Sequence, residues 1–181
     1  MTEEFTGIME HKIFTKNMYI RHAIMHLLRG CRPEKKHYIV DIDSYTSFSA
    51  LMGALKNAQP EEEQHIILIK GNGIHSRVLS PLSTLAYDDC LEDIRRSLKN
   101  KNIPEWKHIR NHLSEMQEWS MMTSREMDVI RFMVRFSDIT TAARELNSNN
   151  KAFYSRIRTI AKKLNLRSAN DVRRLAIAEH I

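Results

Sequence analysis

The chain of 181 residues is too short for a large catalytic barrel, and with 42% apolar residues it suits one or two globular domains. It contains no run of about 18 apolar residues that could span a bilayer, and its first residues are acidic and polar rather than typical of a secretory signal. Its two cysteines, Cys31 and Cys90, form neither a C-x-x-C motif nor a disulfide framework. We therefore expect a cytoplasmic protein in a reducing compartment.

The net charge of +6 comes entirely from the last third of the sequence. Residues 1–122 carry 16 basic and 16 acidic side chains, whereas residues 123–181 carry 12 basic and 6 acidic ones. Within residues 151–174 there are eight bases and one acid, Asp171. A basic block in one small helical unit indicates a polyanionic partner, of which nucleic acid is the first candidate. The alternative interpretation is that these side chains form the solvated face of a helical bundle.

The first hundred residues alternate short apolar runs of strand length with segments of helical periodicity. Strands are expected over residues 12–15, 38–42, 65–69 and 82–86. Helices are expected over residues 18–28, 48–58 and 88–98. Because strands that alternate with helices pair in parallel, residues 1–100 are predicted to form a small α/β domain of roughly four strands.

A connecting segment over residues 101–121 is predicted to contain a polar helix from about residue 105 to residue 118. Trp106, Ile109, Leu113 and Met116 form a narrow apolar stripe along this helix. The stripe fits an ordinary linker helix and also fits one side of a dimer seam, and it is too short to define a coiled coil.

The chain after Pro104 has no glycine or proline, and its apolar spacing predicts helices to the end. Thr123 and Glu126 fit a capping box at the start of the first helix. The Asn- and Ser-rich residues 147–150 are a turn, and Asn165 is expected in the left-handed conformation after the third helix. The second to fourth helices are expected over residues 139–146, 151–164 and 170–179.

The predicted helix over residues 151–164 has one apolar and one cationic face. Phe153, Ile157, Ile160 and Leu164 form a stripe that must be buried, and the opposite face has no acidic partners. A short helix, a polar turn and such a helix are typical of a helix-turn-helix, whose second helix enters the major groove of DNA. The residues expected to contact DNA are Asn149, Asn150, Lys151, Tyr154, Ser155, Arg156, Arg158, Lys162 and Lys163.

Three short matches carry a family resemblance. Residues 122–126 read M-T-S-R-E, close to the motif L-T-x-R-E. Residues 143–146 fit the end of the segment I-A-x-x-L, with Ala142 in the place of the isoleucine. Ile160, Lys163 and Leu164 match the end of the signature T-V-K-x-H-x-x-x-I-x-x-K-L, whereas Ala152 and Tyr154 depart from it. Arg156 also replaces the signature histidine. Residues 122–181 thereby resemble the LuxR-type helix-turn-helix domain of bacterial response regulators.

The resemblance implies a partner and a mode of association. Its helix-turn-helix span would run from Ile139 to Arg158, and its partner would be double-stranded DNA. The last helix of such domains mediates dimerisation, and here Ile177 is expected to point away from the core. Ala152, Tyr154 and Arg156 differ from the family pattern. The DNA sequences that the family recognises are therefore not expected to be the target sequences of this chain.

The usual companion of this domain is a receiver domain, whose phosphoryl chemistry needs several fixed groups. These are an acidic pair that holds Mg²⁺, an aspartate after the third strand, a Thr or Ser, and a Lys. Here Lys16 and Asn17 occupy the first position, and Asp43, less favourably Asp41, is the only candidate for the aspartate. About 26 residues separate Asn17 from Asp43, too few for a helix, a strand and a second helix. We expect a degenerate receiver-like domain without one strand–helix pair, and no phosphoacceptor.

Other residue patterns give no support for metal, nucleotide or catalytic chemistry. Two pairs of histidines have helical spacing: His22 with His26, and His108 with His112. Glu115 could join the second pair as a metal ligand. The histidines are expected to be exposed rather than to bind metal. The segment 71–73, Gly-Asn-Gly, lacks the lysine of a phosphate-binding loop. No nucleophile or paired-carboxylate motif is present, so neither an enzyme nor a cofactor is expected.

The sequence therefore predicts a phosphorylation-independent transcriptional regulator that binds duplex DNA as a dimer, with itself or with another regulator. The alternative is a protein–protein adaptor that heterodimerises with another regulator and has little sequence-specific DNA binding of its own. The departures at Ala152 and Tyr154 motivate this alternative.

Overall fold

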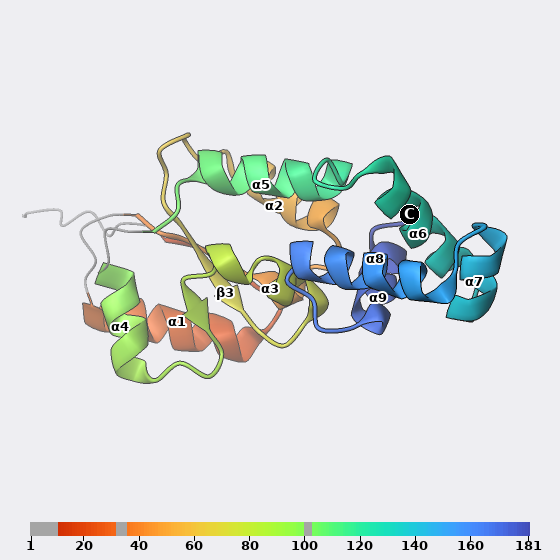
Figure 1. Cartoon of the computed structure of the whole chain (residues 1–181). Helices are drawn as coiled ribbons and strands as arrows, with labels where there is room; N and C mark the ends of the chain where they lie inside the picture. Colours follow the sequence, from red (N-terminus) through yellow and green to blue (C-terminus); the bar gives the residue numbers. More distant parts are fainter. Residues whose placement is uncertain (1–10, 32–35, 100–102) are drawn as a thin grey trace, which may run out of the picture.

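The computed structural model of the chain describes residues 11–31, 36–99 and 103–181 (Figure 1). Four strands form one sheet in the order β1-β2-β3-β4, and every neighbouring pair is parallel. The strands are β1 (Lys12–Phe14), β2 (Tyr38–Asp41), β3 (Ile66–Lys70) and β4 (Leu85–Ala86). The predicted parallel α/β unit is confirmed. None of the helices among the described residues is long and apolar enough to cross a membrane.

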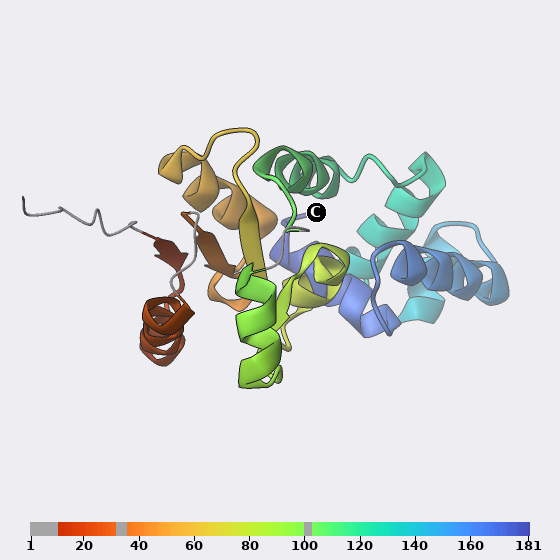
Figure 2. The ribbon, with the colours of Figure 1, turned by 90° about the vertical axis from the view of Figure 1, so that its left-hand side faces the viewer.

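Helices cover both faces of the sheet (Figure 2). On one face, α1 (Met18–Cys31) and α4 (Leu91–Lys99) pack with Ile39 and Ile67 of the central strands. On the other face, α2 (Phe48–Ala58) and the short α3 (Ile74–Val78) pack with Val40 and Leu68. Because both faces are covered, the central strands are continuous apolar runs rather than alternating ones.

Helix α5 (Trp106–Glu118) packs beside α2 as part of the layer that covers the sheet. Its apolar stripe is buried in the same core as Val40 and Leu68, with Ile109 and Leu113 at 0% exposure. The backbone N–H of Trp106 also donates to the carbonyl oxygen of Gln64, at 2.7 Å. The stripe is therefore used within the chain, so the dimer-seam interpretation is wrong.

The last four helices pack against one another as a bundle. They are α6 (Ser124–Arg135), α7 (Ile139–Glu145), α8 (Asn150–Lys163) and α9 (Ala169–Ala178). The capping box of Thr123 and Glu126 is present at the start of α6. Asn165 has a φ of 55°, which confirms its predicted left-handed conformation, and Asn147 (φ 49°) ends α7 in the same way.

Some short elements depart from the sequence-based expectation. Helix α3 was not predicted, because glycines and Pro81 punctuate a segment too short to show a period. The 3₁₀ turns Ile42–Ser44 and Ser80–Leu82 were missed for the same reason. The helix expected over residues 88–98 begins at Leu91, which is 59% exposed at the first position of α4, whereas Leu98 is buried.

The two halves of the chain meet through α9 and the turn before it. Val172 and Leu175 of α9 belong to the same apolar cluster as the sheet residues Val40 and Leu68. Glu179, at the end of α9, accepts a hydrogen bond from the backbone N–H of Phe48 at 2.9 Å. The outer face of α8 takes no part in this contact, and it remains exposed.

Polar contacts between side chains reinforce this junction. The Glu179 carboxylate lies 2.7 Å from Nε2 of His75, and both side chains are at most 10% exposed. Arg77 of α3 forms an ion pair with Asp171 at 3.2 Å. Nδ2 of Asn165 donates to the carbonyl oxygen of Arg77 at 2.8 Å. Helix α3 is therefore the element of the α/β unit that holds the helical bundle in place.

Candidate nucleic-acid interface

Helices α7 and α8 are held at a fixed angle by local caps and close packing. Asp138 caps α7 by accepting from the N–H of Thr141 at 2.7 Å, and Asn149 caps α8 by accepting from the N–H of Ala152 at 2.7 Å. Ala142 is fully buried, which allows α7 to pack closely against its neighbours. The segment from Ile139 to Arg158 therefore consists of two helices joined by a tight turn.

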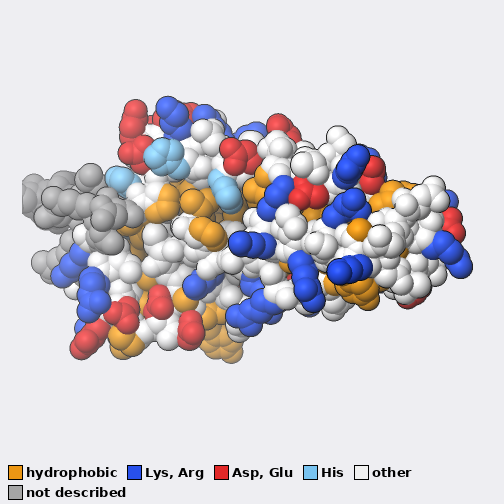
Figure 3. Space-filling view, in the orientation of Figure 1, with side chains coloured by type: hydrophobic (Ala, Val, Ile, Leu, Met, Phe, Trp, Pro, Cys, Tyr) orange, Lys and Arg blue, Asp and Glu red, His pale blue; other side chains and the backbone are white. Residues whose placement is uncertain are grey.

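Helix α8 buries one face and exposes the other, as predicted. Phe153 and Ile160 are 0% exposed, and Ile157 is 2% exposed. The exposed residues of the outer face are Lys151, Tyr154, Ser155, Arg158, Thr159 and Lys162. Lys and Arg side chains gather over α8 and beside it on this face of the molecule (Figure 3). The structure thus brings most of the predicted DNA-contacting residues onto one open surface.

The cations of this surface have no carboxylate to pair with. Helix α8 contains no acidic residue. Lys151, Arg158 and Lys162 form no ion pair with any carboxylate of the described residues. Their charge is therefore available to phosphate groups of a ligand. We call Lys151, Tyr154, Ser155, Arg158 and Lys162 the α8 ridge.

Three further predicted residues lie at the turn before the ridge or reach it with their side chains. Asn149 and Asn150 are exposed, although the Asn149 side chain also caps α8. Arg156 is only partly exposed, and its Nη1 donates to Oγ of Ser148 at 3.2 Å. Arg156 thus ties α8 to the turn.

Lys163 differs from the other predicted residues because its ammonium group already has partners within the bundle. Its Nζ lies 2.7 Å from Oε2 of Glu126 and donates to the carbonyl oxygen of Met121 at 3.1 Å. The spacing within α8 does not reveal this contact, since Glu126 lies 37 positions earlier in the sequence. Lys163 thus ties α8 to the start of α6, and its contact with DNA stays a prediction.

The Glu126 carboxylate is the buried partner in this tie, with a side-chain exposure of 9%. Burial by itself opposes ionisation, but the hydrogen bonds from Lys163 and from the Thr123 N–H outweigh it and lower the pKa of Glu126 below its ordinary value. The carboxylate is therefore charged at neutral pH, and it joins the cap of α6 to the end of α8.

At the carboxyl end of the sheet, Asp41 rather than Asp43 occupies the strand end. Asp41 is the last residue of β2 and is 2% exposed. It accepts hydrogen bonds from Thr15 Oγ1 at 2.7 Å, from Ser44 Oγ at 2.6 Å and from the Tyr87 hydroxyl. The sequence spacing favoured Asp43 for this position, and that preference is wrong because β2 ends at Asp41 and the chain then turns into a 3₁₀ helix.

Asp43 is engaged in a different way. It accepts from the backbone N–H of Gly73 at 2.9 Å and from Ser76 Oγ at 2.5 Å, and it thereby fixes the start of α3. A Cβ atom at either Gly71 or Gly73 would collide with the Asp43 carboxylate. The Gly-Asn-Gly segment is thus explained by this close approach.

Tyr87, Thr15 and Ser76 were not singled out from the sequence, although they hold these two carboxylates. Burial, together with the hydrogen bond to the charged Asp41, raises the pKa of Tyr87. The phenol therefore remains protonated and donates to Asp41. Lys16, which follows β1, is exposed, and its backbone N–H donates to Oγ of Ser44 at 2.9 Å.

Neither histidine pair is part of a metal-binding cluster among the described residues. His22, His26 and His108 are exposed as predicted. His112 is partly buried, and burial lowers its pKa although Glu115 lies 4.0 Å away and opposes the shift. Across the described parts of the chain, no three His, Cys, Asp or Glu side chains are close enough to hold a metal ion.

This chain is similar to known proteins in its structure but not detectably in its sequence. No protein-family model and no curated protein matches the sequence. The structure of the two-component response regulator RcsB in a DNA complex aligns with a TM-score of 0.63 and 16% sequence identity, over 94% of this chain and 98% of RcsB. The chain has the fold of a full-length response regulator. This confirms the predicted combination of a receiver-like α/β unit and a helical C-terminal unit.

A second, more distant similarity concerns RcsB from Salmonella enterica serovar Typhimurium bound to the promoter rprA in the presence of BeF₃⁻. It aligns with a TM-score of 0.45 and 17% identity, over 88% of this chain and 97% of RcsB. At this identity the likeness concerns the fold, and the assignment of site residues rests on the geometry described above.

The tie between Glu126 and Lys163 predicts a pH-dependent stability. Glu126→Gln is expected to lower the free energy of unfolding by about 1–3 kcal/mol at neutral pH, because the neutral amide cannot form the ion pair with Lys163. Since the pKa of Glu126 is lowered in the folded chain, its contribution is present above the ordinary value of 4.5 and is lost as the pH falls through the folded pKa. Urea unfolding across this range measures the difference.

The matched control is Glu118→Gln at an exposed position of α5, which is expected to change the stability little at any pH. If the free energy of unfolding of Glu126→Gln differed from that of the parent chain by the same amount at acidic and neutral pH, the tie would not act through the ionised carboxylate.

Proposed function

We propose that the chain is a transcription regulator that binds duplex DNA with α8 in the major groove. The observation that supports the proposal is the α8 ridge, a row of exposed polar and cationic side chains on a helix whose other face is buried. Arginine can bond guanine through two nitrogens, and lysine neutralises phosphates. The presence of DNA in the RcsB complex of the same fold supports this choice of partner.

The position of the α/β unit is compatible with this function. It contacts α9 and the turn around Asn165, and it leaves the α8 ridge exposed. No rearrangement of the two halves is therefore needed before DNA approaches α8. The ridge would meet the groove floor with Tyr154, Ser155 and Arg158, and the groove edges with Lys151 and Lys162.

The turn residues complete the proposed interface. Asn149 and Asn150 are placed to reach phosphate groups at the start of α8, where backbone N–H groups also favour anions. Arg156 supports the turn through Ser148. The proposed interface does not depend on Lys163, because Glu126 holds its ammonium group.

The proposal includes a dimer on DNA, formed with a second copy or with another regulator. Ile177 is 53% exposed on α9, while Val172 and Leu175 on the same helix are buried. Helix α9 can thus contact the α/β unit with one face and present Ile177 to a neighbouring chain. Helix-turn-helix dimers bind two half-sites in this way.

The proposal further holds that DNA binding is independent of phosphorylation. Hydroxyl groups already engage Asp41, and a hydroxyl group and a backbone N–H engage Asp43. The residues that follow β1 are Thr15 and Lys16, which supply no carboxylate for Mg²⁺.

Salt dependence tests the DNA interface directly. The full-length chain is titrated with a pool of genomic duplex fragments at several salt concentrations, alongside the Arg158→Ala and Lys162→Ala variants. Both variants are expected to bind more weakly, and Lys162→Ala is expected to reduce the slope of log K against log salt by about 1, because one phosphate contact is lost.

The control is Lys56→Ala, which removes an exposed cation of α2 outside the interface. It is expected to leave affinity and slope unchanged, and two chains per duplex are expected at saturation. Salt-insensitive binding, or equal effects of all three variants, would contradict the proposal and favour the adaptor that acts only beside another regulator.

Acetyl phosphate with Mg²⁺ tests independence from phosphorylation. The intact chain is expected to gain no covalent phosphoryl group, as measured by mass spectrometry, and its DNA affinity is expected to remain the same. Phosphoryl transfer to Asp41 or Asp43, abolished in the corresponding Asp→Asn variant, would overturn this part of the proposal.

A further inference from the structure

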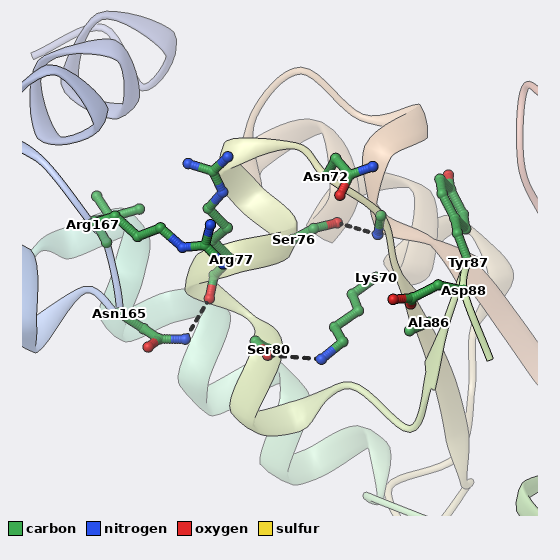
Figure 4. Close-up of a pocket in the computed structure, with 12 residues that line it drawn as sticks. Lys70, Asn72, Ser76, Arg77, Ser80, Ala86, Tyr87, Asp88, Asn165 and Arg167 are labelled. Carbon is green, nitrogen blue, oxygen red and sulfur yellow. Dashed lines mark hydrogen bonds between the residues drawn. The ribbon is translucent and has the colours of Figure 1, made fainter. Parts of the chain in front are cut away.

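A polar cavity of about 420 Å³ lies between the two halves of the chain (Figure 4). Its wall comes from four parts of the fold: the end of β3 with the residues after it, helix α3 with the residues just after it, the end of β4 with the residues after it, and the turn between α8 and α9. The volume falls within the range of small-molecule sites in proteins. It is separate from the α8 ridge, since no ridge residue lines it.

Three cations, each from a different part of the fold, line this cavity: Lys70, Arg77 and Arg167. Lys70 ends the buried strand β3, and its Nζ reaches only Ser80 Oγ, at 3.4 Å. Arg167 comes from the helical bundle, and Figure 4 shows its side chain extending toward α3. Among the described residues that line it, Asp88 is the only carboxylate, so the cations of the lining outnumber its acids.

The charges of these cations are incompletely compensated. Arg77 pairs with Asp171 through one nitrogen at 3.2 Å, which leaves most of its guanidinium donors for another acceptor. Lys70 and Arg167 form no ion pair with a carboxylate of the described residues. A partly buried lysine that contacts only a hydroxyl is favoured when an anion occupies the space beside it.

The remaining wall suits an oxyanion with several acceptor atoms. The Ser80 hydroxyl and the amides of Asn72 and Asn165 border the same space and are donors in addition to the cations. The carboxylates of Asp41 and Asp43, by contrast, would repel an anion at their own position. An anionic ligand is therefore directed to the cationic side of the cavity.

We propose that this cavity binds a compact phosphorylated anion of about the size of a diphosphate. The ligand bridges Lys70 of the α/β unit and Arg167 of the helical bundle, and it thereby strengthens the junction that α3 and α9 already form. The site depends on the junction of the two halves, and it does not depend on the proposed DNA binding.

Calorimetric titration and thermal melting of the full-length chain test the site, with sodium pyrophosphate and ADP as probes and sodium sulfate at matched ionic strength as the reference. Pyrophosphate or ADP is expected to bind saturably with one site per chain and to raise the melting temperature above that in sulfate. Lys70→Gln and Arg167→Gln are each expected to weaken this binding at least about tenfold, because a charge-assisted bond is lost.

Lys56→Gln is the control for a nonspecific effect of charge, since Lys56 is exposed on α2. It is expected to bind the probes like the parent chain. Tighter binding of ADP than of pyrophosphate supports the site with a nucleotide as ligand, and the reverse supports it with an inorganic or other phosphate.

Three results would overturn the proposal: no saturable binding of either probe, equal weakening in Lys56→Gln, or unchanged binding in both Lys70→Gln and Arg167→Gln. DNA titrations of Lys70→Gln in phosphate-free buffer separate the two proposals. Unchanged DNA affinity together with lost pyrophosphate binding supports the cavity as a site of its own, whereas loss of both would make Lys70 part of the DNA interface and overturn it.

Discussion

The contact between α9 and the α/β unit determines which surface of the helical bundle is free. Glu179 and Asp171 bind partners on α2 and α3, and the apolar side of α9 joins the core of the sheet. Because these contacts occupy α9 and the turn before it, the outer face of α8 is left to solvent. The proposed function, the proposed cavity and the open position of the ridge all depend on this arrangement.

The two proposed binding surfaces differ in how the chain supports their charge. On α8 the cations stand on a rigid helix, since Phe153, Ile157 and Ile160 fix its inner face and the caps at Asn149 and Asn165 fix its ends. At the junction the cations come from three parts of the fold, so their separation depends on how the two halves meet. The α8 ridge thus suits a large anion with regularly spaced charges. The cavity suits a small anion whose binding depends on the relative position of the two halves.

Much of the fold could be predicted because its elements have local signatures. The strands 38–41 and 66–70 are apolar runs between polar turns, and the start of α6 has its capping box within four residues. The α8 ridge was predictable because the period of a helix places its residues on one face. The role of Lys163, the strand-end position of Asp41 and the burial of the α5 stripe depend on distant contacts that no local pattern contains. The cavity brings together residues about a hundred positions apart, and spacing alone could not reveal it.

The most direct test of the central claim, that DNA contacts the exposed face of α8 while α9 stays docked, is lysine modification of the full-length chain read by mass spectrometry with and without duplex DNA. The account predicts that DNA protects Lys151 and Lys162 and leaves the exposed Lys56 as reactive as before. Protection confined to lysines outside α8, with Lys151 and Lys162 unchanged, would contradict it.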